Sequence, residues 1–187
     1  MEALLTSTAL VAVAEIGDKT MLLAIVLASR FRRPLPIIAG IFFATILNHA
    51  LAAWAGSLAA DFFAGQTFRL IVAASFVAMG LWTLVPDTFD EDEAPAVSAR
   101  GAFLTTLVSF FLVEMGDKTQ LATIALGARF HDVLAVAAGT TAGMMLANVP
   151  AVLLGDALVK RVSLKAVRFT AAALFVAVGV WMLVEAL

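Results

Sequence analysis

The chain has 187 residues, of which 63% are hydrophobic and only 14% charged, with a mean hydropathy of +1.02. A soluble domain of this size cannot bury so much apolar surface, whereas a run of about 20 apolar residues crosses a bilayer core of about 30 Å. The absence of Cys excludes a disulfide framework, a thiolate metal site and cysteine redox chemistry. The formal net charge of -2 does not indicate a nucleic-acid partner. We therefore predict an integral membrane protein.

Six apolar segments follow one another along the chain, separated by short stretches rich in charged and turn-forming residues. The least distinct boundary is at 57–68, where Asp61, Gly65 and Gln66 are the only interruptions. The first segment is not a cleaved signal peptide, because Glu2 stands where a basic region would be. We predict an all-α membrane protein with six transmembrane helices, over about 4–28, 34–56, 67–86, 102–127, 133–155 and 166–186.

A six-residue motif in the first span, "EIGDKT" at 15–20, is repeated in the fourth span as "EMGDKT" at 114–119. When residue i is aligned with residue i+99, about 25 of the 70 positions from 15 to 84 are identical without a gap. Shared apolar composition does not explain so long a match, so the sequence indicates a tandem duplication. The predicted parts are a three-helix repeat, an acidic linker and a second three-helix repeat, over 1–86, 87–100 and 101–187.

An odd number of spans in each repeat places the second repeat in the membrane with the opposite orientation, so we expect two inverted repeats. The Lys and Arg residues outside the motifs support an orientation, because most of them fall on one face. That face carries Arg30, Arg32, Arg33, Arg100, Lys160, Arg161, Lys165 and Arg168, and the other only Arg69 and Arg129. We therefore expect a cytoplasmic linker and both termini outside. Short length without a targeting extension favours the bacterial cytoplasmic (inner) membrane.

Both motifs lie near the middle of their spans, where a charged side chain costs about 2.5–3.5 kcal/mol on insertion scales. Glu15, Asp18 and Lys19 are spaced i, i+3 and i, i+4, which predicts that they share one helix face. The motif glycines, Gly17 and Gly116, leave room for close backbone approach or local unwinding. Two-fold symmetry would bring the motif faces of the first and fourth spans together.

The combined motifs hold four carboxylates and two ammonium groups, a formal charge of -2. One dehydrated divalent cation would neutralise this cluster, and so would two protons, which is the basis of an exchange mechanism. Carboxylate oxygens suit hard cations such as Ca²⁺, Mn²⁺ and Mg²⁺, whereas zinc and copper more often use His and Cys. The two histidines, His49 and His131, are dispersed along the chain.

At these residues the sequence resembles the Gdt-type family of manganese- and calcium-proton exchangers, which includes MneA-type manganese exporters of bacteria. The resemblance rests on the twin E-x-G-D-K-T motif and covers essentially the whole chain. It implies antiport of a divalent cation against protons, with the acidic motif residues as the metal site. In this sequence the implied ligands are Glu15, Asp18, Glu114 and Asp117, and the motifs are completed by Lys19, Thr20, Lys118 and Thr119.

The two copies differ just after the motif, where Gln120 is similar to what the family often shows and Met21 takes the equivalent place in the first half. Only Gln120 is able to add an amide oxygen, so a fully symmetric ligand shell is not expected. Asn148 precedes Pro150 in the fifth span and is either a pathway residue or part of a satisfied kink. The motif lysines are either counter-charges of the empty site or residues that never meet the cation. Trp82 and Trp181 have the pattern of interfacial anchors without a chemical role.

Three rival functions use the same features. An intramembrane aspartyl hydrolase needs two Asp residues that share a proton, but it needs neither the Glu nor the Lys that accompany each Asp here. A channel with an acidic ring would carry current without moving protons. An exporter of amino acids or other small organic cations would use the same acidic cavity.

We predict a secondary active transporter that exports manganese or calcium from the cytoplasm in exchange for protons, and not an enzyme. The four carboxylates bind one cation, the halves rock about the midplane site, and protons replace the cation. The partners are then the cation, protons and the lipid bilayer, without a resident cofactor. The sequence leaves open whether copies of the chain form a homo-oligomer, for which the small residues of "GTTAG" at 139–143 offer one packing face.

Overall fold

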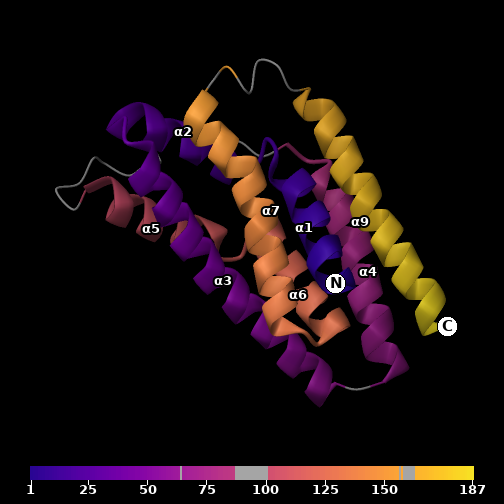
Figure 1. The fold of residues 1–187 in the computed structure, drawn as a ribbon. Coiled ribbons are helices and arrows are strands. Elements are labelled where there is room, and N and C mark those ends of the chain that lie inside the picture. The colour runs from indigo at the N-terminus through magenta and orange to yellow at the C-terminus, as the bar shows by residue number, and fades with distance from the viewer. Residues whose placement is uncertain (64, 87–100, 156, 158–162) are drawn as a thin grey trace.

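The computed structural model describes residues 1–63, 65–86, 101–155, 157 and 163–187, and every regular element in these ranges is an α-helix (Figure 1). The predicted all-α class is therefore confirmed. The acidic linker at 87–100 and the basic residues Arg100, Lys160 and Arg161 lie outside the described residues. The helices are α1 Glu2–Glu15, α2 Lys19–Phe31, α3 Pro34–Phe62, α4 Gln66–Thr83, α5 Gly101–Glu114, α6 Lys118–Phe130, α7 Val133–Leu154 and α9 Leu164–Ala186.

Four of these helices, α3, α4, α7 and α9, are long and apolar enough to cross a membrane. α3 has 29 residues and α9 has 23, which corresponds to about 44 and 35 Å at 1.5 Å per residue. Large apolar side chains such as Phe43, Trp54, Leu134 and Val184 are exposed on their outer faces, as expected for side chains that contact lipid. The structure is therefore that of an integral membrane protein.

The segments predicted as the first and fourth spans are each divided into two shorter helices. α1 and α5 have 14 residues each, and α2 and α6 have 13 each. The bounds of α5 and α6 are those of α1 and α2 moved by 99 residues. The continuous helices expected over 4–28 and 102–127 are thus wrong, because each is interrupted at its motif. The count of six spans and their inverted orientation stay predictions.

Helix boundaries elsewhere differ from the prediction mainly at 57–68. α3 continues to Phe62 because its last turns, "SLAADF", contain no residue that interrupts a helix. Gly65 follows with a φ of 133°, a conformation that a residue with a side chain rarely adopts, and it precedes the first residue of α4. The connection between α3 and α4 is therefore only a few residues long.

Small residues let α4 and α9 approach closely. A contact from the first half to the second has an equivalent contact from the second half to the first. A Cβ at Gly80 of α4 would lie 2.9 Å from the carbonyl oxygen of Ala172, and one at Gly179 of α9 would lie 2.9 Å from that of Ala73. Ala172 and Gly179 are the i+99 equivalents of Ala73 and Gly80. Larger residues at these positions would separate α4 from α9.

The "GTTAG" segment of α7 packs inside the protein. Gly139 and Gly143 lie against the backbone of α1 around Leu4 and Thr8, so an added Cβ would come within 2.6–2.7 Å of those carbonyl oxygens. Within the described chain, this face is therefore used by α1 and does not provide a free surface for a second copy. The tight α1–α7 contact places the C-terminal end of α1, and with it Glu15, in the interior of the bundle.

Candidate functional site

The motif breaks each apolar span at the same place. α1 ends at Glu15 and α2 begins at Lys19, and the equivalent break separates Glu114 from Lys118. Gly17 and Gly116 have φ values of 84° and 83°, which an L-residue with a side chain adopts only at a cost of about 1–2 kcal/mol. The glycine in each motif is thus needed for the short turn between the two helices.

Each Asp of the motif precedes a new helix and occupies the N-cap position. Asp18 and Asp117 have extended backbone conformations, with φ of -78° and -75° and ψ of 166° in both. Negative groups are favoured at this position, since the first helical amides carry partial positive charge. Each Glu lies at the other side of the break, at a helix C-terminus whose last carbonyl oxygens have no helical partner. The break therefore places the acidic side chains of each motif at two helix ends inside the bundle.

Three of the four predicted ligands come together in the structure. Glu15, Glu114 and Asp117 each offer one carboxylate oxygen within 4.8 Å of the others, and all three are buried. Two of these residues come from the second motif and one from the first. The tertiary fold therefore joins the two motifs into one acidic group, in the described part of the chain.

The carboxylate of Glu15 is held by hydroxyl groups from both motifs. Thr20 donates to Glu15 Oε2 at 2.8 Å, and Thr119 donates to Glu15 Oε1. All three side chains are buried. The two motif threonines are therefore buried donors to the Glu15 carboxylate and not residues of a helix surface.

Glu114 has the same sequence context as Glu15 and a different environment. Both of its carboxylate oxygens are buried without a hydrogen-bond donor among the described residues, and so is Asp117 Oδ2. A buried carboxylate without partners is strongly unfavourable, unless it loses its charge or binds a cation. These three oxygens are therefore the atoms of the site that are available to a metal ion.

Lys19 connects the two motifs. Its Nζ lies 3.1 Å from Asp117 Oδ1, with about a third of the Lys19 side chain exposed and Asp117 buried. The acidic group together with Lys19 has three negative charges and one positive charge, a formal charge of -2. Carboxylate oxygens in such a group suit a hard divalent cation.

Lys118, the equivalent lysine, is buried and lies over the indole ring of Trp82, 5.7 Å from the ring centroid. This is a cation–π contact, so Trp82 is more than an interfacial anchor. Trp181 has a similar contact with Arg129, whose guanidinium carbon lies 5.2 Å from the ring centroid. The two tryptophans thus both pack against basic side chains, and their lack of a chemical role stays a prediction.

The predicted common face of Glu15, Asp18 and Lys19 is also wrong. The spacing argument assumed one continuous helix, whereas the turn at Gly17 places Lys19 in a different helix from Glu15. Lys19 consequently reaches the other motif. Asp18 is buried, but it does not belong to the group of three carboxylates.

Two amide side chains form a chain of hydrogen bonds on the second motif. Gln120 Oε1 accepts from the backbone N–H of Gly116 at 2.6 Å, and Gln120 Nε2 donates to Asn48 Oδ1 at 2.7 Å. Asn48 Nδ2 donates in turn to the carbonyl oxygen of Phe111 at 3.1 Å. The amide oxygen of Gln120, expected as a further ligand, is thus engaged by the backbone. Asn48 was absent from the predicted site, although a buried amide in an apolar span is a signal for it.

Asn148 lies in α7 and is fully buried. Its Nδ2 donates to the carbonyl oxygen of Met144 at 3.0 Å, and its Oδ1 has no donor among the described residues. The amide oxygen is therefore free to accept from water or to contact a cation. A pathway role for Asn148 stays a prediction.

Comparison with known proteins identifies a family for this chain. Residues 3–91 and 102–187 match the sequence profile of the family described as "Divalent cation/proton antiporter GDT1". The chain belongs to this family. The match covers both halves, including both motifs, and confirms the resemblance seen in the sequence.

Relatives are found in bacteria and plants. A protein of Vibrio cholerae serotype O1, named as a candidate manganese exporter, is 48% identical over 94% of this chain and 87% of its own length. GDT1-like protein 5 of Arabidopsis thaliana is 30% identical over 93% of this chain and 92% of its own. GDT1-like protein 3 of rice (Oryza sativa subsp. indica) is 25% identical over 96% of this chain and 72% of its own. No solved structure matches the chain.

Proposed function

We propose that the protein exchanges a divalent cation, manganese or calcium, for protons and exports the cation from the cytoplasm. The observation that carries this proposal is the group of Glu15, Glu114 and Asp117, whose buried oxygens lie within 4.8 Å of one another. Family membership supports the same reaction. The Vibrio cholerae relative, named for manganese, favours that ion.

The cation binds between the two motifs. Glu114 Oε1, Glu114 Oε2 and Asp117 Oδ2 have no donor in the described chain and supply the first ligands, while Glu15 presents its carboxylate from the other motif. Asp18 lies at the equivalent N-cap position of the first motif, outside this group of three carboxylates, and its role as a fourth ligand stays a prediction. Hard oxygen ligands of this kind suit Mn²⁺ and Ca²⁺.

Lys19 acts as the counter-charge of the site when the cation is absent. Its ammonium group neutralises part of the charge of Asp117 from 3.1 Å. A divalent cation at Asp117 repels this ammonium group, and about a third of the Lys19 side chain is already exposed, so it has room to withdraw. The lysine thereby prevents the empty site from holding several unpaired buried charges.

Proton exchange follows from the charge of the group. The three carboxylates and Lys19 carry a formal charge of -2, which either one divalent cation or two protons neutralise. A site that is neutral in both loaded states can be enclosed in the membrane interior at low electrostatic cost while its access changes sides. Enclosing the empty, charged site costs more. This difference couples the outward movement of the cation to the inward movement of protons.

The two halves are inverted repeats that alternate the access of this site to the two sides of the membrane. The reciprocal contacts of Gly80 and Gly179 between α4 and α9 support a two-fold relation between them. Eight basic loop residues on one face and two on the other support external termini in a bacterial inner membrane.

The test uses purified protein in liposomes with a pH-sensitive dye inside. Mn²⁺, Ca²⁺, Mg²⁺ and an amino acid are added outside in turn, and we expect Mn²⁺ or Ca²⁺ to drive proton release from the liposomes. Glu114→Gln abolishes this release, whereas the exposed Glu2→Gln retains it as a matched control. Current without proton movement would indicate a channel, and a response to the amino acid alone would indicate an exporter of organic cations; either result contradicts the proposal.

A further inference from the structure

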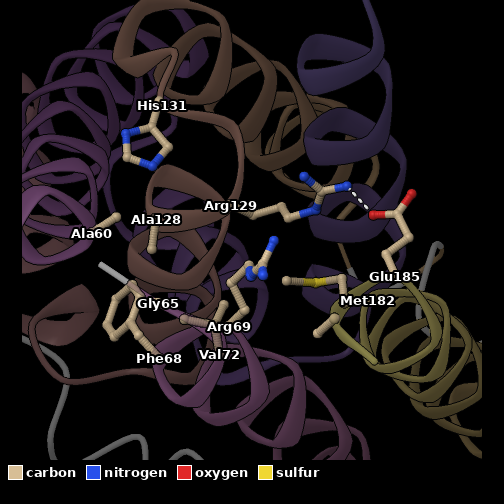
Figure 2. Close-up of a pocket in the computed structure, with 11 residues that line it drawn as sticks. Ala60, Gly65, Phe68, Arg69, Val72, Ala128, Arg129, His131, Met182 and Glu185 are labelled. Atoms are coloured by element: carbon tan, nitrogen blue, oxygen red, sulfur yellow. Dashed lines mark hydrogen bonds and ion pairs between the residues drawn. The ribbon is translucent and has the colours of Figure 1, made fainter. Parts of the chain in front are cut away.

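A cavity of about 400 Å³ lies apart from the acidic group, where the ends of α3, α4, α6 and α9 meet (Figure 2). It is lined by Arg69, Arg129, His131 and Glu185 together with small and apolar side chains. Arg69 is in the first turn of α4 and Arg129 in the last turn of α6, so the cavity lies at the level of a membrane surface. None of these residues belongs to the cation site.

The charges of this cavity suit an anion. Arg129 is bonded to Glu185, but no acidic side chain in the described ranges forms an ion pair with Arg69. Figure 2 shows both guanidinium groups extending into the same space. Gly65, which precedes α4 and does not cap it with a side chain, also lines the cavity, so the N-terminus of α4 lies beside it. A divalent cation would be repelled here.

A second cavity of about 380 Å³ lies next to the first, along α4 and α6. Phe68, Val72 and Ala128 line both cavities. The second is almost entirely apolar and extends from Phe68 to Trp82, a distance of about 21 Å along α4 at 1.5 Å per residue. Ala78 of α4 and Leu121 and Ala125 of α6 are among the residues that line it.

We propose that the two cavities form one site for an anionic phospholipid. The phosphate binds Arg69, because a guanidinium group binds phosphate oxygens in a bidentate manner, while Arg129 lies beside it and keeps its ion pair with Glu185. One acyl chain follows the groove between α4 and α6, whose length exceeds the hydrocarbon half of a bilayer, about 15 Å. A free phosphate would satisfy Arg69 but would leave the adjoining groove unfilled, so the apolar groove favours a lipid.

The test measures the lipid retained by purified protein in detergent micelles, by native mass spectrometry after addition of phosphatidylglycerol or phosphatidylcholine. We expect retention of phosphatidylglycerol to exceed that of phosphatidylcholine about tenfold. Arg69→Gln removes this preference, and Ala78→Trp fills the groove and lowers retention of both lipids. Arg69 and Ala78 are exposed, so neither change disturbs buried packing.

Matched controls separate these effects from general changes of charge or size. Arg33→Gln alters an exposed arginine outside the cavity, and Ala177→Trp alters the exposed i+99 equivalent of Ala78 on α9. Both controls retain phosphatidylglycerol as the unaltered protein does. Equal retention of the two lipids, or unchanged retention in Arg69→Gln, would overturn the proposal.

Inorganic phosphate distinguishes a lipid from a free anion. If phosphate displaces phosphatidylglycerol and Ala78→Trp has no effect on retention, the site takes phosphate alone and the lipid proposal is wrong. Retention is measured without transport, so this result does not depend on whether the protein exchanges cations for protons.

Discussion

The two copies of the motif agree in five of six residues but lie in different surroundings. Glu15 accepts hydrogen bonds from two buried threonines, whereas both oxygens of Glu114 are buried without a donor among the described residues. Gly17 lies under the side chain of Leu164, whereas an added Cβ at Gly116 would meet nothing within 4 Å. The same motif sequence thus lies in a closely packed environment in the first half and in a more open one in the second.

This difference is what an alternating transporter built from two similar halves requires. In any one state such a protein is open to one side, so the equivalent residues of its halves cannot have identical neighbours. The protein has a hydroxyl-bonded carboxylate on one side of its acidic group and an unpartnered carboxylate on the other. We expect the two environments to be exchanged during transport.

The largest expected effect concerns the two glutamates. Glu15→Gln and Glu114→Gln each lower proton-coupled transport by at least about a hundredfold, because each removes a charge from the acidic group. Their stabilities without divalent cations differ, however. Glu15→Gln keeps one acceptor oxygen but leaves the hydroxyl group of one threonine without its acceptor, at a cost of about 1–3 kcal/mol, while Glu114→Gln removes a buried charge that accepts no hydrogen bond from the described residues and is neutral or stabilising.

Thermal unfolding in a chelating buffer measures this difference between the two glutamine variants. Equal stability of the variants would show that the hydrogen bonds of Thr20 and Thr119 do not distinguish the two carboxylates. Addition of Mn²⁺ is expected to stabilise the unaltered protein and neither variant.

The motif lysines are expected to differ next. Lys19→Met removes the counter-charge of Asp117, so the apparent affinity for Mn²⁺ rises while the maximal rate falls about tenfold, because the cation leaves more slowly. Lys118→Met loses a cation–π contact with Trp82, worth about 0.5–2 kcal/mol of stability. Initial rates over a range of Mn²⁺ concentrations separate affinity from rate, and identical kinetics of the two variants would contradict the asymmetric roles.

The motif glycines test the closed and open environments directly. Gly17→Ala and Gly116→Ala both force a side chain into a positive φ, at about 1–2 kcal/mol each. Gly17→Ala costs more, since its Cβ would lie 2.7 Å from Leu164 Cδ2. In the Leu164→Ala background the two alanine variants should lose equal stability, which a double-mutant cycle measures.

The smallest effect is expected from exchanging the residues that follow the motifs. Gln120→Met removes the hydrogen bonds to Gly116 and Asn48 and lowers the free energy of unfolding by about 1–2 kcal/mol. Met21→Gln adds an amide at the equivalent place, where the N–H of Gly17 now lies 3.4 Å from Met21 Sδ. Transport by both variants should stay within a few-fold of that of the unaltered protein. Loss of transport in Gln120→Met, with transport retained in Met21→Gln, would indicate that Gln120 is a ligand.

Much of the site was predictable because charged residues in a membrane span are costly. Glu15, Glu114 and Asp117 stand out in apolar surroundings, and their repetition indicated a functional pair of motifs. Asn48 was harder to predict, because its role depends on Gln120, 72 residues later in the chain. Hydrophobic pattern contains no information on such a distant pairing.

The helix break shows why local spacing was not sufficient. The spacing of Glu15 and Lys19 predicted a contact on one helix, but Gly17 adopts a positive φ and Lys19 begins a new helix. A glycine is compatible with both structures, so its presence allowed an interruption without requiring one.

The sequence alone determined that this is an all-helical membrane protein with a duplicated acidic motif, since composition and repetition are properties of the chain itself. Only the tertiary structure decided which three carboxylates meet, that Lys19 pairs with Asp117 of the other motif, and that the amide oxygen of Gln120 binds backbone. These contacts join residues far apart in the chain or on either side of a helix break. Their distances depend on how the helices pack, which local spacing does not specify.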